Sequence, residues 1–202
     1  ENKLVRIYNS FNFDEIYRLA DKEIEKELEG KYLLAIGRLE ETQKDFTTLI
    51  KAYSKISNEV EESLYIIGDG RHREQLENLV RELKIEDRVK FLGFRTNPYP
   101  YLKRANLFVH SSKFEGFGLV ILEAMILGRM VIATDCPTGP SELLDNGKNG
   151  ILVEVGNIDE MAENMKKVLI NKEIQKDYLI NAEKKLKEFD AKLVMIEFEN
   201  IL

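Results

Sequence analysis

Six short apolar segments recur along this chain, and most of them are separated by segments in which apolar residues repeat at every third or fourth position. Short apolar runs that end at glycine or at a small polar residue are typical of buried strands. Segments with the longer spacing are typical of helices that bury one face. The alternation predicts an α/β fold built on a parallel sheet of about six strands, with helices on both faces. The predicted strands are residues 32–37, 64–68, 89–93, 107–110, 130–133 and 151–153.

Helical patterns flank the predicted sheet on both sides. An amphipathic helix with an acidic outer face is expected over Asp14–Glu29, and helical patterns continue from Asn157 onward. Ahead of the first helix, Leu4–Tyr8 has the pattern of a strand. Because Glu1 leads almost directly into this segment, we expect the chain to have been cut from a longer protein.

Composition narrows the class of protein. The 202 residues are 44% hydrophobic and 33% charged, which is ordinary for a folded chain and not for a disordered one. A net charge of -6 without a basic stripe argues against binding to nucleic acid or to an anionic membrane. The single cysteine, Cys136, cannot form an internal disulfide, and no apolar run is long enough to span a bilayer. A cytoplasmic location is therefore expected.

The turn after the first apolar run is cationic. In a parallel sheet, ligands bind at the carboxyl ends of the strands, so such turns carry the candidate site residues. Gly37 and Arg38 open this turn, and Lys44 closes it just before a helix. A diphosphate suits the turn, because Arg offers a planar fork of donors and Lys a point charge. The alternative is that both are surface cations paired with nearby acids, namely Glu40, Glu41 or Asp45.

The turns after the second and third runs offer glycines and an aromatic ring. Gly68 and Gly70 follow the second run and would let the backbone approach a planar ligand closely. Glycine after a strand is also ordinary turn chemistry. Phe94 and Arg95 follow the third run and would wall a pocket for a base.

The segment after the fourth run is the most informative one. A helix expected over Leu119–Leu127 is apolar almost all round and therefore buried, yet it carries Glu123. An ionised carboxylate in such a place needs hydrogen-bond donors. These donors are either the hydroxyl groups of a ligand or groups of the protein itself, and the sequence leaves both readings open.

Backbone N–H groups of Gly116–Gly118, at the start of the same helix, form an expected anion site, which includes Phe117. Glu115 lies just before this site. Two carboxylates, Glu115 and Glu123, around an anion site suit a ligand with hydroxyl groups at both ends and phosphate between them. That description is met by a sugar nucleotide.

Two histidines complete the set of candidate groups. His110 ends the fourth run, where it would either contact phosphate or sugar or serve as a hydrogen-bonded structural residue. His72 is expected on a helix surface. Cys136 has no histidine or lysine neighbour that would make it a thiolate, so we interpret it as a small turn residue.

Taken together, these motifs resemble the C-terminal, donor-binding domain of the GT-B glycosyltransferases of family 4 (group 1), a Rossmann-like unit. The resemblance covers residues 30–170 in order and rests on five matching segments: 35–39 with 43–50, 67–70, 89–93, the pair Glu115 and Glu123, and 146–153. The chain departs from the family pattern by an extra residue between Arg38 and Lys44 and by Asp45, where glycine is frequent.

The resemblance implies a role for each site residue. Arg38 and Lys44 would hold the donor diphosphate together with the backbone at Gly118 and Leu119. Glu123 would bind the ribose hydroxyls, and Glu115 would contact the donor hexose as the catalytic residue. The family transfers the sugar with retention of anomeric configuration, needs no metal or other cofactor, and uses a nucleotide sugar, here expected to be a UDP-sugar, as substrate.

The resemblance also implies a domain plan. Residues 1–30 would form an inter-domain linker segment and helix, 31–170 the nucleotide-sugar-binding domain, and 171–202 the C-terminal helices. The acceptor, a bacterial surface glycan or a lipid-linked glycan, would bind through an N-terminal domain that this chain lacks, and any membrane contact would lie there. The chain alone would then be inactive in transfer.

Two other functions compete with a transferase. The first is a nucleotide-sugar-binding module or subunit without catalytic activity, against which the presence of both Glu115 and Glu123 argues. The second is a dinucleotide-dependent oxidoreductase with the same layered fold. The oxidoreductase is disfavoured because no G-x-G-x-x-G motif follows the first run, where the turn is cationic instead.

Overall fold

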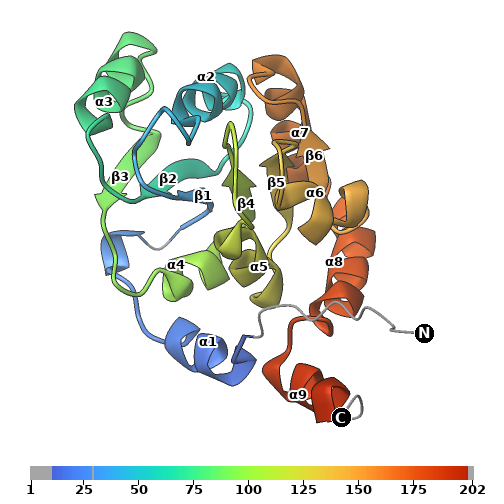
Figure 1. Cartoon of the computed structure of the whole chain (residues 1–202). Helices are drawn as coiled ribbons and strands as arrows, with labels where there is room; N and C mark the ends of the chain where they lie inside the picture. Colours follow the sequence, from blue (N-terminus) through green and yellow to red (C-terminus); the bar gives the residue numbers. More distant parts are fainter. Residues whose placement is uncertain (1–10, 29, 200–202) are drawn as a thin grey trace.

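The computed structural model describes residues 11–28 and 30–199. Its centre is a sheet of six parallel strands in the order β3-β2-β1-β4-β5-β6 (Figure 1). The strands are β1 (Tyr32–Ile36), β2 (Ser63–Ile67), β3 (Val89–Gly93), β4 (Leu107–His110), β5 (Val131–Thr134) and β6 (Ile151–Val153). All six predicted strands are therefore confirmed to within one residue at each end, and the predicted fold class is confirmed.

Helices cover both faces of the sheet. In the view of Figure 1, α2, α3 and α7 lie above the sheet, while α1, α4 and α5 lie below it. Each layer encloses its own cluster of buried apolar side chains, as expected when a sheet is apolar on both faces. The helices are α1 (Phe13–Ala20), α2 (Phe46–Ile56), α3 (Arg73–Glu82), α4 (Tyr99–Arg104), α5 (Leu119–Ile126), α6 (Pro140–Leu143), α7 (Ile158–Ile170), α8 (Glu173–Leu186) and α9 (Ala191–Glu199).

The prediction of an amphipathic helix over Asp14–Glu29 is wrong about the length of the helix. Helix α1 ends at Ala20, and only a short 3-10 turn, Lys26–Leu28, follows. The side-chain amide of Asn97 donates to the carbonyl of Leu19 at 2.9 Å, which ends the helical hydrogen bonding there. Further on, Glu25 accepts a hydrogen bond from Tyr101, which ties the non-helical residues after α1 to α4. These tertiary contacts outweigh the local pattern.

Two other expectations concern the ends and the membrane. The strand predicted at Leu4–Tyr8 lies outside the described residues. Within residues 11–28 and 30–199, no helix combines the length and the apolar character needed to cross a membrane. The helices predicted beyond Asn157 are confirmed as α7, α8 and α9.

The order of the strands indicates where in the sheet a ligand would bind. Strands β1, β2 and β3 run outward in one direction from the centre, and β4, β5 and β6 run outward in the other. The order thus reverses between β1 and β4, which are paired through Leu33 with Leu107 and Leu34 with Phe108. In open α/β sheets, a crevice for ligands forms at the carboxyl ends of the strands at this reversal. We use the name β1–β4 crevice for the position where the loops that follow β1 and β4 meet.

Candidate functional site at the β1–β4 crevice

The loops after β1 and β4 are joined by backbone hydrogen bonds. The N–H of Asp45 donates to the carbonyl of Ser111 at 3.0 Å, and the N–H of Lys113 donates to the carbonyl of Gln43 at 2.8 Å. These bonds flank an antiparallel bridge between Lys44 and Ser112. The cationic loop and the segment leading to Glu115 therefore form one unit.

Glu115 lies at the centre of this unit. The Nζ of Lys44 forms an ion pair with Oε1 of Glu115, and the side chains of the two residues are only 12% and 9% exposed. The same oxygen lies 2.9 Å from Nε2 of His110 and accepts a hydrogen bond from the hydroxyl of Ser112 at 2.8 Å. Three side chains thus converge on one carboxylate oxygen.

The protonation of this cluster follows from its burial and its partners. Burial by itself raises the pKa of Glu115, but the hydrogen bonds from His110 and Lys44 and their charges outweigh it and lower the pKa to about 2. Burial lowers the pKa of His110 below its usual 6.5. At neutral pH the carboxylate is therefore ionised and the imidazole neutral, so the imidazole donates its Nε2–H to Glu115.

The loop after β5 supports Glu115 from a third side. The hydroxyl of Thr138 donates to the carbonyl of Glu115, and the N–H of Glu115 donates to the carbonyl of Pro137 at 3.4 Å. A Cβ at Gly139 would lie 2.4 Å from the carbonyl oxygen of Phe117, so only glycine permits this approach. The backbone around Glu115 is thereby fixed against β5 as well as β4.

The start of α5 is open to an anion. Gly118 precedes the helix in the left-handed conformation, with φ +86°, and no side chain caps the helix. The N–H groups of Leu119 and Val120 donate to no acceptor within residues 11–28 and 30–199. Leu119 is 52% exposed, so these donors lie near solvent. Most of the following residues of α5 are buried, as predicted. Such a helix start binds anions through its N–H groups and its dipole.

Arg38 and Lys44 differ in their surroundings. Arg38 is exposed, and it forms no ion pair with any residue of the described part of the chain. Lys44 pairs with Glu115 and not with a neighbouring acid. The alternative that both cations pair with the nearby acids is therefore wrong for this structure.

Those nearby acids have other partners. Glu40 pairs with Arg71, Glu41 accepts the N–H groups of Phe46 and Thr47, and Asp45 caps α2 through Thr48. The expectation that His72 is a simple helix-surface residue is also wrong. His72 is half-buried at the start of α3, and its Nδ1 accepts the N–H of Glu41 at 3.2 Å.

Glu123 has a protein partner of its own. The hydroxyl of Tyr99, at the start of α4, donates to Oε1 of Glu123 at 3.0 Å. Burial raises the pKa of Glu123, and the hydrogen bond from Tyr99 partly offsets this. The sequence alone did not indicate Tyr99, because this donor comes from a different helix.

The glycines after β2 serve the backbone of the cationic loop. A Cβ at Gly68 would lie 1.8 Å from the carbonyl oxygen of Gly37, and one at Gly70 would lie 2.5 Å from that of Leu39. Gly68 and Gly70 thus allow main chain to pack on main chain below Arg38. A direct approach of these glycines to a ligand stays a prediction.

The two residues after β3 lie in different environments. Phe94 is 72% exposed at the carboxyl edge of the sheet. Arg95 is tied to the segment after α1, with its Nη2 3.0 Å from Glu25 and its Nε 3.1 Å from the hydroxyl of Tyr101. A base could therefore contact the Phe94 ring without displacing an ion pair, whereas Arg95 is already engaged.

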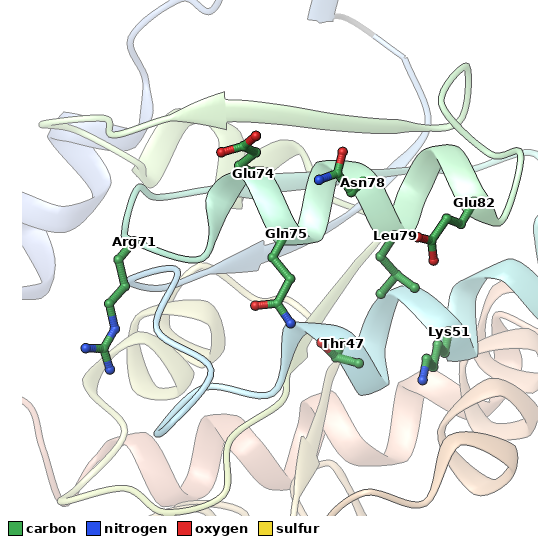
Figure 2. A pocket seen from close by; sticks show the side chains of 8 residues that line it. All are labelled: Thr47, Lys51, Arg71, Glu74, Gln75, Asn78, Leu79 and Glu82. Carbon is green, nitrogen blue, oxygen red and sulfur yellow. The ribbon is translucent and has the colours of Figure 1, made fainter.

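A separate hollow of about 610 Å³ lies between α2 and α3 (Figure 2). Its lining mixes both charges with amide and hydroxyl groups: Thr47, Lys51, Arg71, Glu74, Gln75, Asn78, Leu79 and Glu82. None of the predicted site residues lines it. The β1–β4 crevice is the stronger candidate site, because the paired charges of Lys44 and Glu115 are largely buried there, whereas no charged residue that lines this hollow is buried.

Comparisons with known proteins show the family to which the chain belongs. The family model for glycosyl transferases group 1 matches residues 18–185. This range includes every predicted site residue from Gly37 to Glu123. A match over most of the chain shows the family.

Individual relatives are named as sugar transferases. One, from Campylobacter jejuni, is an N-acetylgalactosamine-N,N'-diacetylbacillosaminyl-diphospho-undecaprenol 4-alpha-N-acetylgalactosaminyltransferase. It is 34% identical over 184 residues, which make up 91% of this chain and 49% of that protein. Another, the lipopolysaccharide 1,6-galactosyltransferase of Salmonella typhimurium, is 35% identical over 67% of this chain and 39% of its own length.

A solved structure shows the same fold. The crystal structure of HepE from Anabaena in complex with UDP and glucose superposes with a TM-score of 0.79 at 27% identity. The match covers 97% of this chain and 56% of HepE. The chain thus spans about half the length of the proteins it matches. With its six-stranded sheet and its matched residues 18–185, the chain belongs to the glycosyl transferases group 1 family.

Proposed function

We propose that this chain is the donor-binding half of a retaining glycosyltransferase. The enzyme transfers a hexose or an N-acetylhexosamine from a UDP-sugar to a bacterial surface glycan or a lipid-linked glycan. The observation that carries the proposal is the ionised Glu115, held by Lys44 beside the open start of α5 at the β1–β4 crevice. A carboxylate and an anion site lie side by side where a sugar diphosphate presents hydroxyls and phosphate.

The diphosphate binds to positive groups from two loops. Arg38 is exposed and carries a permanent charge, and the N–H groups of Leu119 and Val120 add the helix start. Lys44 can bridge Glu115 and a phosphate, because an ammonium group has three donors. Together these groups neutralise the charge that develops on the leaving diphosphate. No metal is then required, and we expect transfer to persist in the presence of EDTA.

The rest of the donor binds to flanking residues. Glu115 contacts the donor hexose and stabilises positive charge near the reacting carbon. Glu123 accepts hydrogen bonds from the ribose hydroxyls, and the exposed ring of Phe94 walls the base pocket. The structure of HepE with UDP and glucose supports a uridine nucleotide as the donor, because the match with HepE covers 97% of the residues of this chain.

The acceptor half belongs to a further domain in this proposal. The C. jejuni relative is named for a diphospho-undecaprenol glycan, and this chain corresponds to 49% of it. That comparison supports a lipid-linked acceptor and a second domain that binds it. Within the chain, 1–30 serve as linker segment and helix, 31–170 as donor domain, and 171–202 as C-terminal helices.

The proposal is tested by binding and by transfer. Calorimetric titration of this chain with UDP-glucose, UDP-GlcNAc and UDP-GalNAc is expected to show binding, with GDP-mannose as the control donor. The chain alone is expected to transfer no sugar, because the acceptor surface lies elsewhere. The full-length gene product is expected to transfer with retention, which NMR of the product's anomeric proton reports.

Each other outcome has a definite meaning. Absence of binding to every nucleotide sugar overturns the proposal. Binding without transfer by the full-length protein, across a panel of lipid-linked and polysaccharide acceptors, points instead to a non-catalytic binding module. Transfer by the chain alone contradicts the division into donor and acceptor halves.

A further inference from the structure

We propose that His110 is a positioning residue for Glu115: together with Ser112 it holds Oε1, which leaves Oε2 for the donor sugar. The inference rests on the proposed function, in which Glu115 contacts the donor hexose. His110 itself touches no substrate in this arrangement. It acts through the carboxylate.

The hydrogen bonds on Glu115 are distributed unevenly. Oε1 receives the ammonium of Lys44, the Nε2 of His110 at 2.9 Å and the hydroxyl of Ser112 at 2.8 Å. Among the described residues, Oε2 receives no hydrogen bond. A carboxylate oxygen has two lone pairs, so Oε1 is fully occupied by protein while Oε2 keeps its accepting capacity. One oxygen anchors the group and the other is free to accept from a sugar hydroxyl.

Lys44 alone cannot fix this orientation during a reaction. Its side chain is long and flexible, and the donor diphosphate competes for its ammonium group. His110, in contrast, ends β4 and is 2% exposed, and its ring packs 6.3 Å from that of Phe108 between centroids. A buried ring on a central strand keeps its place when Lys44 turns toward phosphate.

Ser112 is fixed just as firmly. Its N–H donates to the hydroxyl of Thr134 at 2.8 Å, and that hydroxyl donates back to the carbonyl of Ser112 at 2.7 Å. The Oγ of Ser112 lies 3.1 Å from Nε2 of His110, so the two groups stay together. Glu115 is therefore aligned by side chains attached to β4 and β5, and not by the ammonium of Lys44 alone.

The neutral state of His110 suits this role. A neutral imidazole donates to the carboxylate without cancelling its negative charge, whereas a second cation beside Lys44 would weaken the stabilisation of positive charge at the anomeric carbon. The titratable groups that affect His110 are Lys44, whose charge opposes protonation, and Glu115, which favours it. The buried thiol of Cys136 also lies in the field of these two residues.

Kinetics of the full-length protein test the inference. His110→Leu removes the donor, and His110→Gln supplies an amide N–H at the reach of Nε2. We expect His110→Leu to lower kcat by roughly tenfold or more. We expect the KM for the UDP-sugar to stay within roughly twofold, because a positioning defect affects the transition state more than ground-state binding. His110→Gln is expected to recover most of the loss.

A matched control separates positioning from general damage. Tyr53→Phe removes another buried hydrogen bond, from the Tyr53 hydroxyl to the carbonyl of Glu62 at 2.8 Å, at the opposite end of the sheet. It is expected to lower the melting temperature without changing kcat. A parallel loss of kcat in Tyr53→Phe, or a wild-type kcat in His110→Leu, overturns the inference.

A measurement independent of activity uses this chain with 15N-labelled histidine. NMR is expected to show the proton of His110 on Nε2 at pH 7. In Glu115→Gln the pKa of His110 is expected to fall further, because the carboxylate that favours its protonation is gone. A proton on Nδ1, or an unchanged pKa, overturns the inference even if His110→Leu fails to fold.

The inference and the proposed function fail in different ways. If wild-type protein and Glu115→Gln have the same activity, the proposed role of Glu115 is wrong. If Glu115→Gln is inactive while His110→Leu keeps full activity, only the positioning role of His110 is wrong.

Discussion

Tyr99 donates its hydroxyl hydrogen to Oε1 of Glu123 across 3.0 Å, which links the start of α4 to the interior of α5. Burial and the nearby carboxylate raise the pKa of Tyr99 to about 12, so the phenol remains a donor throughout the physiological range. Glu123 therefore keeps a structural partner in the protein. One hydrogen bond leaves accepting capacity on the carboxylate for a ribose.

Glu123→Gln is expected to weaken UDP binding and to reduce discrimination against 2′-deoxy-UDP. The substitution keeps the shape but removes the charge, and a hydrogen bond to a charged group contributes about 1.5–3 kcal/mol, or roughly ten- to a hundredfold in affinity. Titration calorimetry with both nucleotides measures the ratio. If the ratio is unchanged while the melting temperature of the protein falls, Glu123 has only the structural role that Tyr99 suggests.

Arg38→Ala is expected to weaken UDP-sugar binding more than Lys44→Ala. The charge of Lys44 is already matched by Glu115, whereas Arg38 is exposed and forms no ion pair with the described residues. A bidentate guanidinium is also harder to replace than a flexible ammonium. Arg81→Ala, on the exposed face of α3, is the control and should bind as wild type does. Equal affinities of Arg38→Ala and wild type would contradict the diphosphate role.

Glu115→Gln in the full-length protein is expected to lower turnover by roughly a hundredfold or more, as loss of one preorganised electrostatic group commonly does. The affinity for UDP should stay nearly unchanged, because the proposed partner of Glu115 is the hexose and not the nucleotide. Steady-state kinetics and UDP titration on the same variant measure both quantities. A large loss of UDP binding with normal turnover would reverse the assignment.

The free energy of unfolding is expected to fall as the pH drops below about 6.5. The folded protein keeps His110 neutral because burial lowers its pKa, while the unfolded chain takes up a proton near the ordinary value of 6.5. The unfolded state then binds more protons, so acidification favours it, and the stability is fully present above pH 6.5. Below pH 4.5, protonation of Glu115 in the unfolded chain adds a second decline, because its folded pKa is about 2.

Urea unfolding at a series of pH values checks this dependence. His110→Gln should lack the first decline and keep the second, and Glu115→Gln should lack the second. Identical pH profiles for wild type and His110→Gln would show that another group controls the acid sensitivity.

Gly68→Ala is expected to destabilise the protein and to weaken UDP binding. The new Cβ would lie 1.8 Å from the carbonyl oxygen of Gly37, so the loop that carries Arg38 must move. Gly156→Ala is the control, since Gly156 has φ +78° with open space around it and should lose only about 1 kcal/mol to backbone strain. Unfolding and calorimetry on both variants make the comparison. Equal effects of the two substitutions would mean that the contact with Gly37 is unimportant.

The sheet could be predicted because its strands are short, largely apolar runs, and the four inner strands β2, β1, β4 and β5 are almost entirely buried. The edge strand Val89–Gly93 is less buried, yet its short run ending at glycine also predicts the observed strand residue for residue. The helix over Asp14–Glu29 could not be predicted correctly, because its end at Ala20 depends on Asn97, which is distant in sequence. A local pattern carries no information about such a partner.

The candidate site likewise contains residues that could be predicted from the sequence and residues that could not. The family resemblance placed Lys44 and Glu115 around one ligand, but the pairing of β1 with β4, which brings their loops together, was not predicted from the sequence. Ser112 was missed although it stands two positions after His110, a spacing that puts both side chains on one side of an extended chain. Tyr99 was missed because the residues near Glu123 in the sequence do not indicate that a tyrosine of α4 donates a hydrogen bond to it.

Gly68 lies close to the carbonyl of Gly37, and Gly70 lies close to that of Leu39. The backbone on either side of Arg38 therefore packs directly on other main-chain atoms. Main-chain atoms are the same whatever amino acids surround them. Substitutions of the exposed Phe94 ring are therefore expected to alter which base is preferred, while the backbone beside Arg38 stays unchanged. A library for new donor specificity would randomise Phe94 and hold Gly68 and Gly70 constant, so that every member keeps the same backbone beside Arg38.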